Sequence, residues 1–185
     1  ALLILAALIW TYGAAPYVEL WAPNAALAVV PLVVMPVALL FLVGSLRPSN
    51  PTMAGSDMVL KGELPVTGFT RITRHPMLWA FSLWATAHMI ANGDAATWLL
   101  AGAILITALN GMVSIDRKRK PAFGEAWQRF EARTSIIPFA AASTGRTRLK
   151  ISDLRWLNVI IAAVINGVLL ALHGKLFGVP ALPNI

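Results

Sequence analysis

Long apolar runs separated by polar stretches dominate the hydrophobic pattern of the chain. About 18 mostly apolar residues are needed to cross the hydrocarbon core of a bilayer, and five runs are candidate membrane spans on this criterion. The five runs are Leu2–Pro16, Ala25–Leu46, Pro76–Ala91, Ala95–Ile115 and Trp156–His173. The pattern therefore predicts an all-α fold, a polytopic bundle of about five transmembrane helices that forms a single domain over residues 1–185.

The first run starts at Ala1, with no basic flank and no polar residue before it. A secretory signal peptide would need a basic n-region and a small-residue cleavage site, and the run has neither. We therefore expect the chain to be truncated at its N-terminus, with one more span upstream.

A different periodicity follows the fourth run. Phe123, Trp127 and Phe130 recur at helical spacing among charged residues. This spacing predicts a short amphipathic helix within Pro121–Phe139 that lies on the inner membrane surface. We expect the helix to end at Ile137–Pro138, because proline cannot continue a helix.

Charge places the loops on two sides of the membrane. Only 12% of the residues are charged, where a soluble domain has about 25%. All of the 15 basic residues except Lys175 lie in the loops between the second and third runs and between the fourth and fifth runs. By the positive-inside rule this side is cytoplasmic, which favours the inner membrane of a bacterium. We expect the basic loops to contact anionic lipids, and we expect no nucleic-acid partner.

The sequence also restricts the kinds of metal site and catalytic site that the chain can contain. It contains no cysteine, which excludes disulfides, thiolate metal sites, iron–sulfur clusters and cysteine nucleophiles. It contains none of the common hydrolase or nucleotide-binding motifs. A metal would have to be held by histidine, methionine, carboxylate or a cofactor.

Two histidines are candidates for such a site. His75 precedes Pro76, a residue suited to the first turn of a helix, and so lies at the cytoplasmic interface. His88 lies deeper in the same apolar run. Thirteen residues correspond to about 20 Å along a helix, so one metal cannot bind both histidines. The alternatives are an interhelical hydrogen bond for His88 and an interfacial or headgroup contact for His75.

The string Gly68–Trp79, followed by Leu83–His88 and Ala91–Asp94, resembles the signature of the NnrU family of integral membrane proteins. Ile115–Lys118 and Thr134–Phe139 extend this resemblance. The NnrU family is related to the 15-cis-zeta-carotene isomerases of plants and cyanobacteria, which are membrane proteins that carry haem b.

The resemblance implies a cofactor and two activities. It places His88 at the position of an axial histidine ligand of the haem iron, and His75 at the histidine of the Arg-His-Pro string. Both are therefore expected cofactor-binding residues, with His88 as the metal ligand. The implied activity is cis–trans isomerisation of a hydrophobic polyene such as a carotenoid. NnrU proteins are also linked to nitric oxide and nitrite metabolism in denitrifying bacteria.

Two alternatives come from other classes of protein. Arg74–Pro76, with the basic segment that ends at Phe139, is similar to membrane methyltransferases that use S-adenosylmethionine. In those enzymes an acidic pair follows, whereas this chain has Asp116–Arg117, which we interpret as the end of the fourth helix, and a separate Glu125. The second alternative is a noncatalytic subunit of a larger photosynthetic or respiratory membrane complex.

Overall fold

The computed structural model describes residues 2–22, 24–47, 49–53, 55–56 and 62–181. Within these ranges the chain is helical, and the only extended pairing is a single antiparallel bridge between Glu19 and Asp94. The predicted all-α fold is thus confirmed. The elements are α1 (Leu2–Ala14), α2 (Ala25–Ser45), η1 (Gly68–Arg71), α4 (Pro76–Ala91), α5 (Ala95–Phe123), α6 (Glu125–Arg133), α7 (Ala140–Ser143), η2 (Ile151–Asp153) and α8 (Trp156–Phe177).

Three of the five expected spans, α2, α5 and α8, are long and apolar enough to cross a membrane. The other two expected spans are the helices α1, with 13 residues, and α4, with 16 residues. At 1.5 Å per residue these helices are about 20 and 24 Å long, less than the hydrocarbon thickness of about 30 Å. Helix α5 continues beyond Ile115, the expected end of the fourth span, to Phe123.

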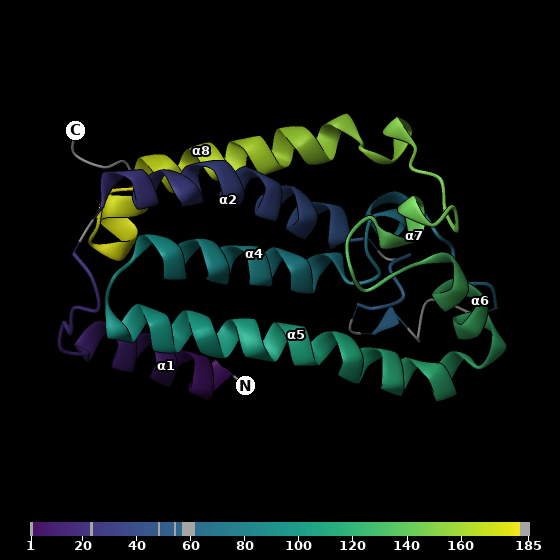
Figure 1. The fold of residues 1–185 in the computed structure, drawn as a ribbon, viewed down its shortest axis with the longest axis horizontal. Helices are drawn as coiled ribbons and strands as arrows, with labels where there is room; N and C mark the ends of the chain where they lie inside the picture. Colours follow the sequence, from purple (N-terminus) through teal and green to yellow (C-terminus); the bar gives the residue numbers. More distant parts are fainter. Residues whose placement is uncertain (1, 23, 48, 54, 57–61, 182–185) are drawn as a thin grey trace.

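The helices lie side by side, with α4 between α2 and α5 (Figure 1). Helix α8 packs against α2, and α1 packs against α5, where the Tyr12 hydroxyl lies 3.0 Å from the Thr97 hydroxyl. The α1–α2 loop, the α4–α5 turn and the C-terminal end of α8 lie at one end of the bundle. The loops on either side of η1 and the segment from α6 to η2 lie at the other end. This arrangement agrees with the expected alternation of loops.

Local features explain where helices α2 and α5 begin and how closely α2 packs against η1. The Asn24 side chain accepts a hydrogen bond from the Ala26 N–H at 2.8 Å, and so caps the start of α2. Asp94 caps α5 in the same way, through the Thr97 N–H at 2.8 Å. Near the end of α2, Gly44 lies so close to η1 that an added Cβ would be 2.2 Å from the Phe69 ring.

The predicted amphipathic helix is present as α6, but its expected end at Ile137–Pro138 is wrong. The helix ends at Arg133, and Thr134 is extended. Hydrogen bonds to the segment before α4 account for the early end. The Thr134 hydroxyl accepts a hydrogen bond from Arg74 Nε at 3.0 Å, and the Ser135 carbonyl accepts one from the Arg74 N–H at 2.7 Å.

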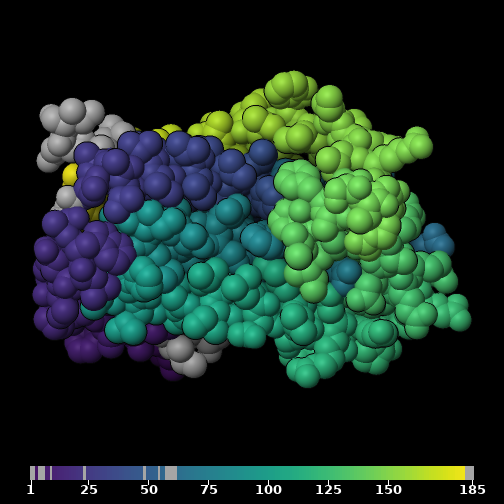
Figure 2. Space-filling model, in the orientation of Figure 1, coloured from purple at the N-terminus to yellow at the C-terminus, as the bar shows by residue number. Residues whose placement is uncertain are grey.

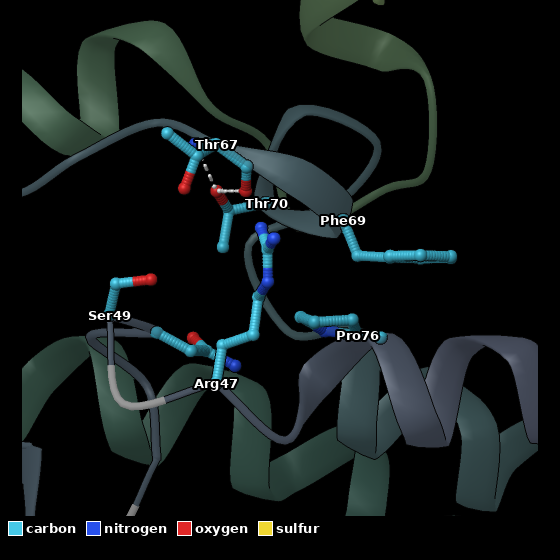
Figure 3. A pocket seen from close by; sticks show the side chains of 8 residues that line it. Arg47, Ser49, Thr67, Phe69, Thr70 and Pro76 are labelled. Atoms are coloured by element: carbon cyan, nitrogen blue, oxygen red, sulfur yellow. Dashed lines mark hydrogen bonds between the residues drawn. The ribbon is translucent and has the colours of Figure 1, made fainter. Parts of the chain in front are cut away.

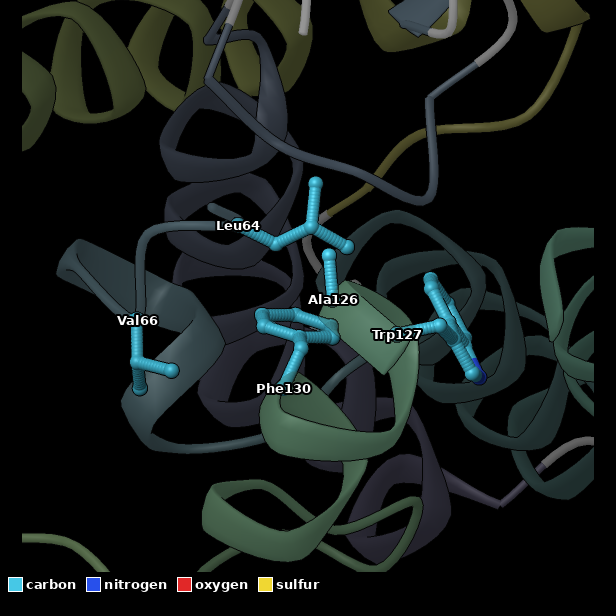
Figure 4. Close-up of a cluster of buried hydrophobic side chains, with 5 residues drawn as sticks. All are labelled: Leu64, Val66, Ala126, Trp127 and Phe130. Atoms are coloured by element: carbon cyan, nitrogen blue, oxygen red, sulfur yellow. The ribbon is translucent and has the colours of Figure 1, made fainter. Parts of the chain in front are cut away.

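The apolar face of α6 packs against the protein itself. Trp127 and Phe130 are buried with Ala126, and Leu64 and Val66 from the segment before η1 cover them (Figure 4). The segment between α5 and α8 gathers over one end of the molecule, while the N-terminal segment covers the other (Figure 2). The basic end of the bundle is therefore a folded cap with its own small core.

Candidate functional site

Helix α4 contains His88 and has His75 as its N-cap residue, and it presents different faces to its two neighbours. Ala80 packs with Phe41 of α2 in a buried cluster. Leu78 lies on the α5 side, where an added Cβ on Gly111 would be 3.3 Å from its side chain. Small residues on α4 allow this close packing, since Ala80, Ala85 and Ala87 are all buried. Two faces of the helix are thus occupied by protein.

The third face of α4 carries Phe81, Trp84 and His88. Residues at positions i, i+3 and i+7 of a helix form one stripe along its surface. Phe81 is exposed, and Trp84 and His88 are half-buried. His88 therefore lies in an aromatic stripe that remains accessible from the side of the bundle.

The environment of His88 fixes the orientation of its ring. Nδ1 lies 2.8 Å from the carbonyl oxygen of Trp84, and the imidazole stacks on the Trp84 ring with the centroids 4.6 Å apart. A carbonyl oxygen can only accept a hydrogen bond, so Nδ1 carries the proton and Nε2 keeps its lone pair. We find no hydrogen-bond partner for Nε2 among the described residues. The ring is thus oriented with an available ligating nitrogen, as second-shell contacts orient metal-binding histidines.

His75 has a different environment at the opposite end of α4. It is the N-cap residue of the helix, as predicted, and its side chain is buried. Nε2 lies 2.8 Å from Oδ1 of Asp116, and Nδ1 is buried without a partner in the described part of the chain. The interpretation of Asp116 as a helix end is wrong, because α5 continues to Phe123. The carboxylate points instead at the start of α4.

Arg74 completes a buried ionic cluster with these residues. Nη1 donates to the Asp116 carboxylate and to Oε1 of Glu131, which is 3.1 Å away, while Nε donates to the Thr134 hydroxyl. We call this group the Arg74 cluster, and its members are Arg74, His75, Asp116, Glu131 and Thr134. It joins the segment before α4 to α5, α6 and the residue that follows α6, so the geometry supports a structural role.

Sequence reasoning missed two members of the Arg74 cluster, Glu131 and Thr134. Both lie more than fifty residues from Arg74. Thr134 begins the Thr134–Phe139 string, but nothing in the sequence paired either residue with Arg74. A usable signal was Asp116, a carboxylate that directly follows an apolar run. Such a group usually needs a charged partner, and Arg74 belongs to the other loop on the same side.

The family model described as NnrU protein matches residues 1–181. The chain belongs to the NnrU family. It is also 35% identical over 83 residues to the protein named 15-cis-zeta-carotene isomerase, chloroplastic, from Zea mays. The aligned residues cover 45% of this chain and 23% of that protein. The Arabidopsis thaliana protein of the same name is 35% identical over 86 residues, covering 46% of this chain and 23% of its own length.

These matches confirm the family resemblance seen in the sequence. The aligned region spans less than a quarter of the length of the two curated relatives. No solved structure is significantly similar to the chain.

The fit of the two histidines to a haem group can be judged from their surroundings. The porphyrin supplies four ligands to the iron, so the protein needs to supply only axial ones. His88 has a free Nε2 on an accessible apolar face, which fits this need. His75 uses Nε2 for Asp116, and its assignment as a cofactor-binding residue stays a prediction. The described residues hold no group of three or more acidic or histidine side chains placed to bind a bare metal ion.

Proposed function

We propose that this NnrU protein is a haem b-dependent cis–trans isomerase of a carotenoid-like polyene. Its similarity to proteins named 15-cis-zeta-carotene isomerase supports the class of reaction. The single observation that carries the proposed site is His88, with Nδ1 bonded to the Trp84 carbonyl and Nε2 left free on the accessible face of α4.

Each of three residues of α4 would have its own role at this site. His88 Nε2 would hold the haem iron, and the Trp84 carbonyl would keep the ring in the tautomer that can bind a metal. Bound haem b would supply an iron centre able to interact electronically with a conjugated polyene. Phe81, exposed on the same stripe, would offer an apolar contact to a substrate that stays in the bilayer. The reaction exchanges one double-bond geometry for another, so it needs no net oxidant or reductant.

A role in nitric oxide or nitrite metabolism would use the same site. The accessible face at His88 would also admit a small ligand to a haem iron, so the two activities differ in substrate and not in the residue that holds the cofactor. The polyene activity is our first proposal because the curated relatives carry that name.

The methyltransferase alternative has less support. It requires Arg74 and His75 to bind S-adenosylmethionine, and both side chains are buried and engaged with Asp116.

We further propose that the basic end of the bundle faces the cytoplasm of a bacterial cell, since the basic loops gather there. A place in a larger membrane complex is an outcome that co-purification would reveal.

Absorption spectroscopy of the detergent-purified chain, expressed with adequate haem, tests the proposed cofactor. We expect a Soret band that shifts on reduction with dithionite, and about one haem per chain by the pyridine haemochrome assay. His88→Ala should abolish the band. His75→Gln should preserve it, because the amide can still donate a hydrogen bond to Asp116. Equal loss of haem in both variants, or no haem in the wild-type chain, would contradict the assignment of His88.

The substrate is tested separately by incubating the haem-loaded protein with a zeta-carotene that carries a 15-cis bond. Chromatography of the extracted pigment should show conversion to the 15-trans isomer with the wild-type chain and not with His88→Ala. Haem binding without conversion would retain the cofactor site and direct the search to nitrogen-oxide ligands. Co-purification with a large assembly, with neither haem nor conversion, would support the noncatalytic alternative.

A further inference from the structure

A small hollow lies at the end of α2, on the basic side of the bundle and away from His88. It is shallow and partly open, with enclosed space for only about one water molecule, and its lining includes Arg47, Ser49, Thr67 and Phe69. The Arg47 side chain extends into this space, between Ser49 on one side and Phe69 on the other (Figure 3).

The guanidinium of Arg47 has no hydrogen bond or ion pair with any described residue, although the side chain is half-buried. The other two arginines of this region are fully engaged. Arg71 pairs with Asp153 at 2.7 Å, and Arg74 pairs with Asp116 and Glu131. The Asp153 carboxylate is therefore already paired with Arg71, and it also accepts a hydrogen bond from the Gly68 N–H at 3.0 Å. Arg47 thus brings an uncompensated positive charge to the hollow.

Hydroxyl groups surround this charge. The Ser49 hydroxyl makes no hydrogen bond within the described part of the chain, and the Thr67 hydroxyl only accepts one, from the Thr70 N–H in the capping box of η1, so both can still donate to a ligand. The Thr70 hydroxyl is occupied by the backbone of Thr67, at 3.0 Å from its nitrogen and 2.7 Å from its oxygen. A planar guanidinium beside two hydroxyls that can still donate matches the several oxygens of a phosphate group, which arginine recognises with paired hydrogen bonds.

The position of the hollow gives the source of such a phosphate. Helix α2 is apolar enough to cross a membrane and ends at Ser45, so Arg47 lies at the depth of the lipid headgroups. The adjacent Leu46 side chain is exposed and can contact acyl chains. The hollow is too small to enclose a phosphate, which would rest at its open mouth against Arg47 while the rest of the lipid remains in the bilayer.

We propose that this hollow binds a phosphate group through the guanidinium of Arg47 and the hydroxyls of Ser49 and Thr67. A phospholipid headgroup and free inorganic phosphate share this chemistry, and the experiment distinguishes them.

The test uses the full chain in detergent and follows its thermal unfolding midpoint against the concentration of each probe. The probes are dioctanoyl phosphatidylglycerol, inorganic phosphate and dioctanoylglycerol, which has the acyl chains but no phosphate. We expect phosphatidylglycerol to raise the midpoint and dioctanoylglycerol to leave it unchanged. Stabilisation by phosphatidylglycerol alone identifies the lipid as the ligand. Equal stabilisation by inorganic phosphate identifies the free ion, with the same site.

Two variants test whether the stabilisation by phosphatidylglycerol arises from binding at the hollow. Arg47→Met should weaken the apparent affinity by about tenfold or more, the usual effect of losing a charge-assisted pair of hydrogen bonds. Arg117→Met is the matched control, because Arg117 is exposed on the same side of the bundle, and it should change the affinity less than about twofold. Equal affinity in the two variants would overturn the proposal, and so would the absence of any shift in the wild-type chain.

Two milder substitutions keep the test decisive if Arg47→Met does not fold. Arg47→Lys retains the charge and loses the planar fork, so the affinity should fall several-fold. Ser49→Ala removes one hydroxyl donor and should also reduce the affinity. Wild-type affinity in both variants would overturn the proposal.

Discussion

Replacing Asp116 with asparagine tests whether the Arg74 cluster holds the cap onto the helices. The substitution keeps the shape of the side chain and removes its charge. Only 5% of the Arg74 side chain and 13% of the Asp116 side chain are exposed, so solvent cannot replace the lost carboxylate. The asparagine has one carbonyl oxygen in place of two carboxylate oxygens, so either the Arg74 guanidinium or the His75 ring loses its acceptor and faces an amide N–H instead.

The structure sets the size of this effect. Removing one partner of a buried ion pair costs about 3–5 kcal/mol, because the other charge stays buried without compensation. Glu131 remains 3.1 Å from Arg74 and compensates part of the charge, so we expect the lower end of that range. For a chain of this length the loss corresponds to a decrease in Tm of roughly 6–12 °C.

The assay is thermal unfolding in detergent, followed by tryptophan fluorescence. Glu125→Gln is the control, since it breaks an exposed pair with Arg129 at 3.5 Å, where the two side chains are 88% and 55% exposed, and should cause no measurable change. The double variant Arg74→Met with Asp116→Leu removes both buried charges and should recover at least half of the lost stability. If Asp116→Asn unfolds at the same temperature as Glu125→Gln, the Arg74 cluster does not hold the cap onto the helices.

Two further predictions concern helix packing. Gly44→Ala should lower the stability by about 1–3 kcal/mol, because its Cβ would overlap the Phe69 ring, whereas Gly167→Ala in α8, with open space around it, should not destabilise the chain. Equal unfolding midpoints for these two variants would contradict the close contact between α2 and η1. Tyr12→Phe should lower the stability by about 1 kcal/mol through loss of the hydrogen bond to Thr97, while Tyr17→Phe, at an exposed position, should have no effect. Chemical unfolding curves of the four variants measure both differences.

The helices could be predicted because apolar runs and membrane helices share one physical cause. Hydropathy located all five runs, but it placed the end of the fourth at Ile115. Lysine and arginine are unfavourable in a bilayer and favourable in a helix, so the helix continues through Lys120 after the apolar run has ended. The end of α6 was misplaced for a related reason. Thr134 leaves the helix to bond with Arg74, a residue sixty positions away that no local pattern reveals.

The candidate site could be predicted only in part. The sequence put His75 and His88 on one helix and too far apart to share a metal, and the structure agrees. It did not distinguish their environments. His88 bonds to a carbonyl four residues earlier in its own helix, whereas His75 depends on Asp116 from another helix, 41 residues away. Polar pairs between residues far apart in the chain produce no periodic pattern along the sequence, so sequence reasoning does not find them.

The position of His88 in the bundle follows from how α4 is held at its two ends. At one end the Arg74 cluster fixes the residues that precede the helix. At the other end the Asn92 side chain donates to the His88 carbonyl at 2.9 Å, and the Gly93 carbonyl accepts the Leu20 N–H at 2.7 Å. Because protein contacts set both ends, the depth of His88 does not depend on a bound cofactor. Loss of haem in His88→Ala would therefore report on ligation, while unfolding of Asp116→Asn would report on the scaffold, and the two effects can be separated.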